Sequence, residues 1–526
     1  MRNFATTAAL AMSLALALGA CSPTPEPTPA PKPPSATATP DPTAALRALV
    51  PGLLPAGSSA GPLGPYAPTQ SQPPSTGTSL RIDLTRPADQ TVGQWTHANV
   101  GLSFEATELA DPRWEPEGSP LATLLHGLDG PSLRFGGNRV DRSLWWTSRQ
   151  EARPAWATQT VTPADLQRLG RMAETVDATV TLVLPLGHKD PERAADMALH
   201  ARRALGKRLL GVSIGNEPNG YALASQEQLR LRDDAWSPQQ WVGEARQYVT
   251  AIHRRVPGLP VAGPGAYDAT WWRAFGDARL PGTVAMSQHW YPLWSCPDRV
   301  GERDAQAAPT VANLTSPALH DRASEMVQRA RRTAAGYELP LWLEEAGPTS
   351  CGGAAVSRSH AHALWSVDFL LNAARNGARR SNLHSTLAEC GRGNPMSPVC
   401  TPPGTRSITG TSTFTAMLFT AQVRPGTIRQ VTTSDPAVIA YTVTSGSGTD
   451  LVLVNLHDPA TSPASTLALT PPKGLRATHG SSLRGTALDS RSGTTMQPLA
   501  RPGTRKGAAG PTVVEPGSAL LVRFSR

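Results

Sequence analysis

Between residues 99 and 423 the sequence alternates eight times between a short apolar, β-rich run and a longer segment with helical periodicity. The predicted strands are Val100–Glu105, Ser132–Gly136, Thr179–Leu184, Leu209–Gly215, Leu259–Gly263, Val284–His289, Leu339–Glu345 and Arg380–His384. The predicted helices include Pro163–Val176, Pro191–Leu205, Pro238–Val256, Ala318–Ala335 and Ser357–Asn376, several of which open with proline. A repeated strand-then-helix order requires parallel strands, and eight such units predict a closed (β/α)8 TIM barrel.

Two glutamates occupy the ends of predicted strands in this barrel. Glu217 follows the fourth strand within Asn216-Glu217-Pro218, and Glu345 ends the seventh strand after Glu344. Active sites of such barrels lie at the C-terminal ends of the strands. Hydrolysis of a glycosidic bond requires one carboxyl group to protonate the leaving oxygen and another to attack or to activate water. We therefore predict glycosidase chemistry, with a pair of structural surface acids as the alternative.

Polar side chains follow six of the eight predicted strands, which supports one shared site at the rim. Besides the two glutamates they include Glu105, Arg134, Asn138, His289, Tyr291 and His384.

Two other motifs do not fit a catalytic role. Gly211-Val212-Ser213-Ile214-Gly215 matches the pattern of serine hydrolases, but its serine lies inside a predicted strand instead of on a sharp turn. His360 and His362 are two residues apart on a predicted helix, where they cannot both face one metal, so we predict that they lie on the surface.

The N-terminal region is typical of an exported lipoprotein. Residues 1–20 contain Arg2 and an apolar run from Ala8 to Leu18, followed by Leu18-Gly19-Ala20-Cys21, which resembles a lipobox with Cys21 as the lipid-bearing residue. The run is too short to span a bilayer permanently. Residues 21–79 are rich in Pro, Thr and Ala and predict a disordered tether. We therefore expect a cell-envelope protein that contacts the membrane through its lipid anchor only.

The barrel, assigned to residues 99–423, is followed by residues 424–526 with short β-type runs. These runs are Ala437–Val443, Leu451–Leu456, Leu467–Leu469 and Ala519–Phe524. Gly, Pro, Ser and Thr separate them, which predicts a C-terminal antiparallel β-sandwich domain. Residues 80–98 contain another such run, Leu80–Leu84, which we expect to join the sandwich.

The net charge of +9 and the pI near 9.7 favour anionic partners. The Arg residues are scattered and no Lys/Arg run resembles a nucleic-acid footprint, so we predict no nucleic-acid partner. A basic surface without meaning for the ligand and an acidic sugar substrate both remain possible interpretations of the charge.

Four cysteines follow Cys21: Cys296, Cys351, Cys390 and Cys400. Their even number in an exported protein, without the paired short gaps of a zinc site, favours disulfides over metal binding. Cys390 and Cys400 are close enough in sequence to staple one loop, whereas Cys296 and Cys351 follow the sixth and seventh strands. The connectivity stays open at this point.

Several motifs occur in the order in which they occur in glycoside hydrolase family 79, which contains β-glucuronidases and is related to heparanase. They are Gly101–Glu105, Leu133–Asn138, Asp141–Trp146, Gly215–Pro218, Gln288–Pro292, Ser350–Gly353 and Ala363–Leu371. The chain resembles this family from about Asn99 to His384. Asn-Glu-Pro alone would indicate only the wider retaining clan.

The resemblance implies roles for particular residues. Glu217 matches the acid/base, and Asn216 matches a neighbour that hydrogen-bonds the sugar 2-hydroxyl. Glu345, six residues before Cys351, matches the nucleophile, although strand alternation indicates only that Glu344 and Glu345 point in opposite directions. Tyr291 matches a tyrosine that hydrogen-bonds the nucleophile. His289, Glu105 and Asn138 belong to the same motifs, and we expect them to contact substrate.

The chain departs from the family pattern at two places. Ala346-Gly347 stands where an Asn-Ser pair is usual after the nucleophile, and Arg139 stands where a small residue often follows Asn138. Both glutamates are kept, so the chemistry is expected to be the same while the exact sugar is left open. We thus expect a retaining β-glycosidase acting on β-glucuronides without metal or organic cofactor. The alternatives are a related enzyme acting on a neutral sugar and a non-catalytic glycan-binding lipoprotein.

Overall fold

The computed structural model describes residues 42–51, 53, 67–68, 79–223, 230–295, 305–470, 473–498, 500–501 and 513–526. These residues belong to one compact unit, Asp41–Arg526. The predicted signal segment 1–20, Cys21 and most of the predicted tether lie outside the described residues. Among the helices of the described parts, none has the length and apolar character needed to span a membrane.

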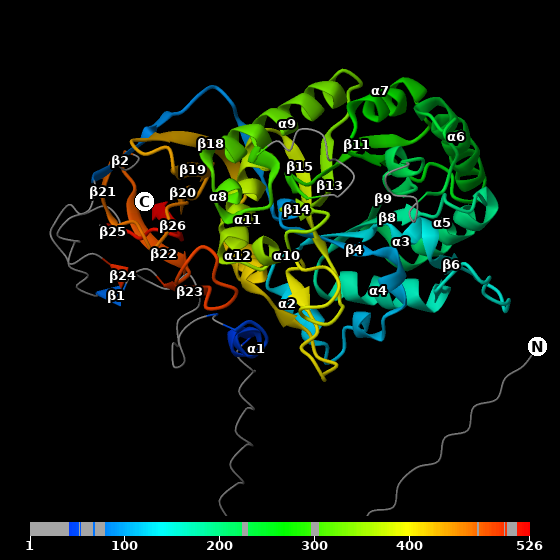
Figure 1. The fold of residues 1–526 in the computed structure, drawn as a ribbon, viewed down its shortest axis with the longest axis horizontal. Helices are drawn as coiled ribbons and strands as arrows, with labels where there is room; N and C mark the ends of the chain where they lie inside the picture. The colour runs from blue at the N-terminus through cyan, green and yellow to red at the C-terminus, as the bar shows by residue number, and fades with distance from the viewer. Residues whose placement is uncertain are drawn as a thin grey trace, which may run out of the picture. The chain divides into compact units, whose positions relative to one another are not determined.

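Eight parallel strands close into a barrel in the order β10-β11-β13-β15-β4-β5-β8-β9 (Figure 1). Their bounds are β4 Gly101–Glu105, β5 Ser132–Gly136, β8 Thr179–Leu184, β9 Leu209–Ile214, β10 Val261–Ala266, β11 Thr283–Trp290, β13 Leu341–Ala346 and β15 Ala378–Ser385. Each barrel strand lies beside the barrel strand that follows it in the chain, and the last, β15, closes against the first, β4, as the alternating pattern predicts. The predicted fold class, a (β/α)8 TIM barrel with a C-terminal antiparallel β-sandwich domain, is confirmed.

Helices surround the barrel. They are α2 Pro120–His126, α4 Pro163–Thr175, α5 Pro191–Leu205, α6 Pro238–Arg255, α7 Ala269–Ala278, α9 Pro317–Ala335, α11 His360–Arg375 and α12 Ser412–Ala421. Prolines begin several of them because the first helical residue needs no N–H donor. The residue before each proline caps the helix: Asp190, Ser237 and Ser316 accept hydrogen bonds from backbone N–H groups of the first turn.

Shorter elements occupy the connections. They are α1 Pro42–Leu49, α3 Arg139–Arg142, α8 Val311–Leu314, α10 Ala354–Ser357, β1 Ala67–Pro68, β6 Leu144–Trp146, β7 Gln159–Val161, β12 Leu293–Trp294, β14 Thr349–Ser350, β16 Val399–Cys400 and β17 Thr409–Gly410. Cys390 and Cys400 form a disulfide with a Cα–Cα distance of 5.0 Å in the loop after β15. Cys351 is also disulfide-bonded, and Cys296 lies outside the described residues.

The C-terminal β-domain is built on a ten-stranded sheet. Its strands are β2 Ser79–Pro87, β3 Gly93–Trp95, β18 Gly426–Thr433, β19 Val438–Ser445, β20 Gly448–Asn455, β21 Ser465–Thr470, β22 Arg476–Arg484, β23 Thr495–Pro498, β25 Val513–Val514 and β26 Ser518–Ser525. The two-residue strand β24, Ala500–Arg501, pairs separately with β1. Strand β2 contains the predicted run Leu80–Leu84 and lies between β18 and β21, so residues before the barrel complete the domain.

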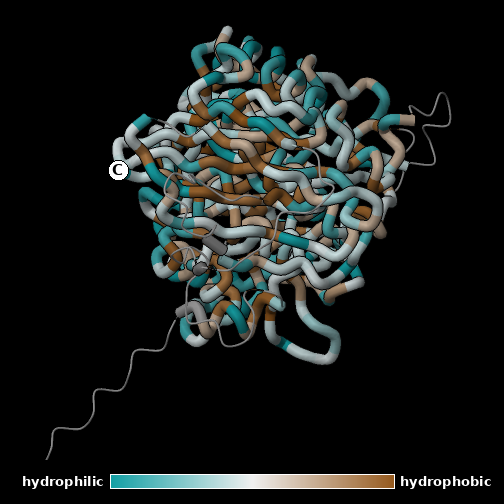
Figure 2. The backbone as a smooth tube through the Cα atoms, turned by 90° about the vertical axis from the view of Figure 1, so that its left-hand side faces the viewer, coloured by the Kyte–Doolittle hydropathy of each residue, from teal (hydrophilic) through white to brown (hydrophobic). Residues whose placement is uncertain are grey.

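Alternation along the central strands gives this sheet two apolar faces. In β20, Val452 and Val454 belong to the main core shared with the barrel, whereas Leu451 and Leu453 belong to a second cluster confined to the β-domain. Figure 2, viewed onto the β-domain, shows hydrophobic residues running across these strands. Because successive side chains point to opposite faces, one strand serves both cores.

The helix α11 corrects the prediction for His360 and His362. Every residue of α11 is buried, since the helix contacts β15 on one side and strands of the β-domain on the other. His360 hydrogen-bonds Thr494 Oγ1 at 2.9 Å and Gly517 O at 2.7 Å, and His362 hydrogen-bonds Ser357 O at 2.8 Å. The surface prediction is wrong because a helix covered on both sides has no solvent face on which to place them.

The predicted tether also needs correction over a short stretch. Helix α1 and the residues after it pack on the barrel: Val50 and Leu53 are buried, and Leu46 and Leu49 pack against the same core. Thr409 Oγ1 donates to Leu49 O at 2.6 Å. These apolar residues recur at helical spacing within a Pro- and Thr-rich region, so composition averaged over residues 21–79 concealed them.

Candidate active site

Glu217 is held by a tight turn at the end of β9. Gly215 has φ 73° and Glu217 itself has φ 47°, a left-handed conformation that is uncommon for a non-glycine residue. A Cβ atom at Gly215 would collide with the Tyr221 hydroxyl, so glycine is required there. The backbone N–H of Glu217 donates to Gly265 O at 3.0 Å, which ties the turn to β10. Strained conformations of this kind persist where the surrounding structure fixes them, often at functional sites.

Glu345, near the end of β13, is buried and surrounded by donors. Its Oε1 accepts a hydrogen bond from the Tyr291 hydroxyl at 2.7 Å, and its Oε2 accepts one from Arg134 Nη1 at 2.5 Å. His384 Nδ1 lies 3.7 Å from Oε1 and 2.8 Å from the Tyr291 hydroxyl. Burial alone would raise the pKa of Glu345, but the charges of His384, His289 and Arg134 and the Tyr291 hydrogen bond outweigh it and hold this pKa well below its usual range.

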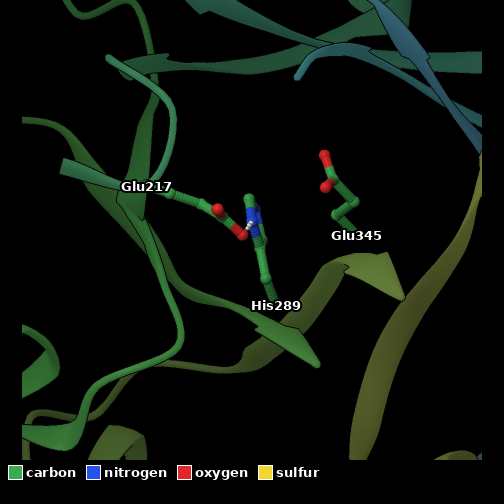
Figure 3. Close-up of side chains that lie close together, drawn as sticks. All are labelled: Glu217, His289 and Glu345. Atoms are coloured by element: carbon green, nitrogen blue, oxygen red, sulfur yellow. Dashed lines mark hydrogen bonds and ion pairs between the residues drawn. The ribbon is translucent and has the colours of Figure 1, made fainter. Parts of the chain in front are cut away.

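The two carboxylates face one another across His289 (Figure 3). His289 Nδ1 hydrogen-bonds Glu217 Oε1 at 2.8 Å, and polar atoms of Glu217, His289 and Glu345 all lie within 4.8 Å of one another. Carboxylate oxygens this close favour the short carboxyl separation of retaining glycosidases, ~5–5.5 Å, over the ~6.5–9.5 Å of inverting ones.

The same three atoms are close enough to hold a metal ion. However, Glu345 already accepts a charge-assisted hydrogen bond from Arg134, whose fixed positive charge would repel a cation at this position. The donor set therefore fits a metal poorly.

Arg134 organises the floor of the site from the middle of β5. Besides Glu345, its guanidinium donates to Ser103 Oγ at 2.9 Å and to Asn216 Oδ1 at 2.6 Å. It thus connects the nucleophile candidate to the residue before the acid/base candidate. Arg134 is 2% exposed, and a fully buried arginine persists only when it is paired.

Glu344 and Glu345 do not simply point in opposite directions. Glu344 hydrogen-bonds Thr181 of β8, four strands away around the barrel, and lies 3.4 Å from Arg380 Nε, so it crosses the barrel interior. Glu345 reaches Arg134, three strands away. The registers of β13 with both neighbouring strands are irregular, between Gln288 and His289 and between Leu343 and Ala346. The prediction from strict alternation is therefore wrong at this position.

Asn216 is oriented by its hydrogen bonds. Its Oδ1 accepts from Arg134 and from Gly137 N at 3.1 Å, which leaves the Nδ2 donor directed toward Asn138 Oδ1 at 3.5 Å. Its backbone N–H donates to Asp141 Oδ2 at 2.8 Å, and Asp141 Oδ1 accepts from the backbone of Leu186. The Asn216 amide is thus presented as a donor at the mouth of the barrel.

Glu105 ends β4 on the same rim. Burial raises the pKa of Glu105 to about 7, and the charge of Glu345 also raises it. The charge of His384 and the hydrogen bond that Arg139 N donates to Oε2 at 2.9 Å lower this pKa but do not outweigh the burial. A Cβ atom on Gly137, which has φ 69°, would collide with the Glu105 carboxylate. Arg139, where the sequence departs from the family pattern, therefore supports Glu105 through its backbone.

The site opens into a cleft of about 1430 Å³. Glu217, Glu345, Tyr291, Asn138 and His384 line it, together with Tyr267, Trp294, Arg322, Arg329, Arg332, Arg358 and Met396. The arginines of α9 and the loop of residues 393–396 form walls that lie far from the motifs in sequence.

Four of the seven predicted site residues, Asn138, Glu217, Tyr291 and Glu345, line the cleft, whereas Asn216 and His289 are buried beside it and Glu105 ends β4 on the same rim. The structure makes hydrogen-bonding centres of Arg134, which the sequence had placed on the rim, and of Asp141, which it had placed only within a motif. A charged residue between apolar neighbours of a buried strand is a signal that could have distinguished Arg134 from the other rim residues. No comparable signal marks the walls of the cleft, because exposed arginines on a helix are ordinary.

No protein-family model and no curated protein sequence matches the chain. Solved structures with similar folds include a 4-O-α-L-rhamnosyl-β-D-glucuronidase from Fusarium oxysporum, with a TM-score of 0.64 and 17% identity over 84% of this chain and all of that one. A family 51 α-L-arabinofuranosidase from Bifidobacterium longum matches with a TM-score of 0.61 and 16% identity over 85% of this chain and all of that one. A family 44 xyloglucanase from Paenibacillus polymyxa matches with a TM-score of 0.58 and 12% identity over 86% of this chain and all of that one. These similarities establish the fold.

Proposed function

We propose that the protein is an exported, lipid-anchored retaining β-glycosidase that hydrolyses β-glucuronides. The observation that carries this proposal is the pair Glu217 and Glu345, whose polar atoms lie within 4.8 Å across His289 in an open cleft. The structural neighbours named above are described as glycosidases, which supports the same class of reaction.

The reaction proceeds by double displacement. Ionised Glu345 attacks the anomeric carbon while Glu217 gives its proton to the glycosidic oxygen, so the aglycone leaves as an alcohol and a glycosyl ester forms on Glu345. Glu217 then takes a proton from water, whose oxygen attacks the anomeric carbon and releases the sugar and the Glu345 carboxylate. Arg134 and Tyr291 hold Glu345 in its ionised form for the attack.

A uronic acid substrate is supported by the sequence resemblance and by the arginines of the cleft. Arg329 and Arg332 are exposed on the side of α9 that borders the cleft. Their charges favour a carboxylate-bearing glycan over a neutral one. The similar TM-scores of the arabinofuranosidase and the xyloglucanase favour the second candidate, a glycosidase for a neutral sugar.

The test is hydrolysis of chromogenic β-glycosides by residues 22–526, which retain α1. We expect glucuronide turnover with the β-anomer as the first product in the NMR spectrum. Glu345→Gln should abolish turnover, while azide should restore product formation in Glu217→Ala by replacing water as the nucleophile. An α-anomer as first product would refute the retaining mechanism, and turnover of neutral glycosides alone would refute the substrate.

The lipid anchor is tested separately. Lipidation at Cys21 predicts that the wild-type protein sediments with membranes and carries an acylated N-terminal cysteine in a mass spectrum. Cys21→Ser should release it, and a membrane-bound Cys21→Ser protein would contradict the anchor without affecting the proposed reaction.

A further inference from the structure

A second cavity, of about 250 Å³, shares no lining residue with the arginine-lined cleft. The cleft is lined mainly from the ends of β9 to β15, whereas this cavity is formed by β6, the residues after β8 and the start of α5. We call it the tryptophan pocket, after Trp145, Trp146 and Trp156 in its wall. Its volume lies below the ~300–1,000 Å³ of sites for drug-sized ligands, so it suits a single small ring.

The walls of the tryptophan pocket offer both apolar faces and polar edges. Trp145 and Trp156 meet edge to face, with ring centroids 5.9 Å apart and an interplanar angle of 80°. The ring of Trp156 stacks on His188 with a centroid distance of 3.6 Å, and the Arg193 guanidinium lies 3.7 Å from the centroid of the Trp145 ring. The wall therefore combines aromatic rings with nitrogen-bearing side chains, which matches a ligand with an apolar face and a polar rim.

The cations that line the pocket are paired with carboxylates. Arg193 pairs with Glu151 at 2.6 Å and with Asp190 at 3.1 Å, and Lys189 lies 3.8 Å from Glu244. Asp141 accepts hydrogen bonds from backbone N–H groups. Both cations are therefore already paired with carboxylates, so an anionic ligand finds no unpaired positive charge here and an uncharged ligand fits better.

We propose that the tryptophan pocket binds one neutral pyranose ring, which packs against the indoles of Trp145 and Trp156. A pyranose has apolar C–H faces and a rim of hydroxyl groups, and the walls of the pocket complement both. The hydroxyl rim distinguishes a sugar from a purely aromatic ligand. Asp141 lines the pocket and holds Asn216 N, so the bound ring lies beside the support of the catalytic residues. This site goes beyond the proposed function, because binding there requires no turnover.

The test uses the Glu345→Gln protein labelled with 5-fluorotryptophan. Fluorine resonances of Trp145 and Trp156 are assigned with the two Trp→Phe variants, and glucose, galactose, xylose, rhamnose and N-acetylglucosamine are titrated. At least one sugar should move both resonances, and Trp156→Ala should weaken its binding at least tenfold, whereas Trp156→Phe should keep most of it. The proposal is overturned if no sugar moves these resonances, if only p-nitrophenol does, or if Trp156→Ala, folded by circular dichroism, binds as before.

A kinetic comparison identifies the source of the ring. If it belongs to the substrate chain, Trp156→Ala in the otherwise wild-type protein should lower kcat/KM for an oligosaccharide about tenfold and leave a simple aryl glycoside unchanged. Equal kcat/KM values for both substrates, together with the resonance shifts, would assign the pocket to a separate sugar molecule.

Discussion

Replacing Glu105 by glutamine should stabilise the protein at alkaline pH and leave its stability unchanged under acid conditions. Burial raises the pKa of Glu105 to about 7 in the folded protein, whereas the unfolded chain has a pKa near 4.5. Below pH 4.5 both states hold the proton. Between pH 4.5 and 7 the unfolded state loses it first, so folding becomes less favourable as the pH rises. Each pKa unit corresponds to about 1.36 kcal/mol, so the penalty above pH 7 is on the order of 3 kcal/mol.

The assay is thermal unfolding of wild type and Glu105→Gln at pH 4.5, 6 and 8. We expect equal Tm values at pH 4.5 and a Tm several degrees higher for the variant at pH 8. The exposed Glu115, which pairs with Arg171 at 2.6 Å, provides the matched control: its pKa is lowered, so Glu115→Gln should give a small loss at high pH instead of a gain. A Tm difference for Glu105→Gln that does not vary with pH would refute the reasoning.

Three further predictions concern the site and its loop. Arg134→Met should raise the pKa of Glu345 and lower kcat/KM at least 100-fold, because Glu345 loses the charged donor that keeps it ionised for attack. Removing one partner of this buried ion pair should also cost about 3–5 kcal/mol of unfolding free energy, and an unchanged kcat/KM would contradict the assigned role. Tyr291→Phe removes one hydrogen bond to Glu345 and should lower kcat about tenfold or more while KM and Tm change little; a loss confined to KM would argue against it. Cys390→Ser removes the disulfide that closes a loop with a sequence separation of 10, and it should lower the free energy of unfolding by about 2–3 kcal/mol. Urea unfolding measures this loss, with dithiothreitol-treated wild type as the control. Equal stability of wild type and variant without reductant would contradict the contribution of the disulfide.

The barrel could be predicted from the sequence because its strands are buried on both faces and read as short apolar runs between capped helices. The end of β9 was equally readable, since Gly215 and Pro218 bracket Glu217. Those signals are local and follow from backbone geometry.

Other features depend on contacts that local patterns do not report. The burial of His360 and His362 follows from the β-domain that covers α11, and the placement of both Glu344 and Glu345 across the barrel follows from irregular register. The ordered helix α1 was hidden because its few apolar residues are outnumbered by prolines nearby. The cleft walls combine residues about 70 positions apart, such as Arg329 and Met396.

Strand β2 precedes the barrel in the chain, and β26 ends the chain, yet both belong to one sheet. The polypeptide therefore leaves the β-domain after its first strands, forms the entire barrel, and then returns to the β-domain. The barrel is thus an insertion in the β-domain, and the segments on both sides of it pair in the same sheet. Cutting the chain at residue 423 would remove most of that sheet, strand β2 would lose its partners, and the apolar surfaces of α11 and α12 would be exposed. The boundary at residues 423 and 424 marks a change of architecture, and the catalytic barrel is expected to need the β-domain to remain soluble.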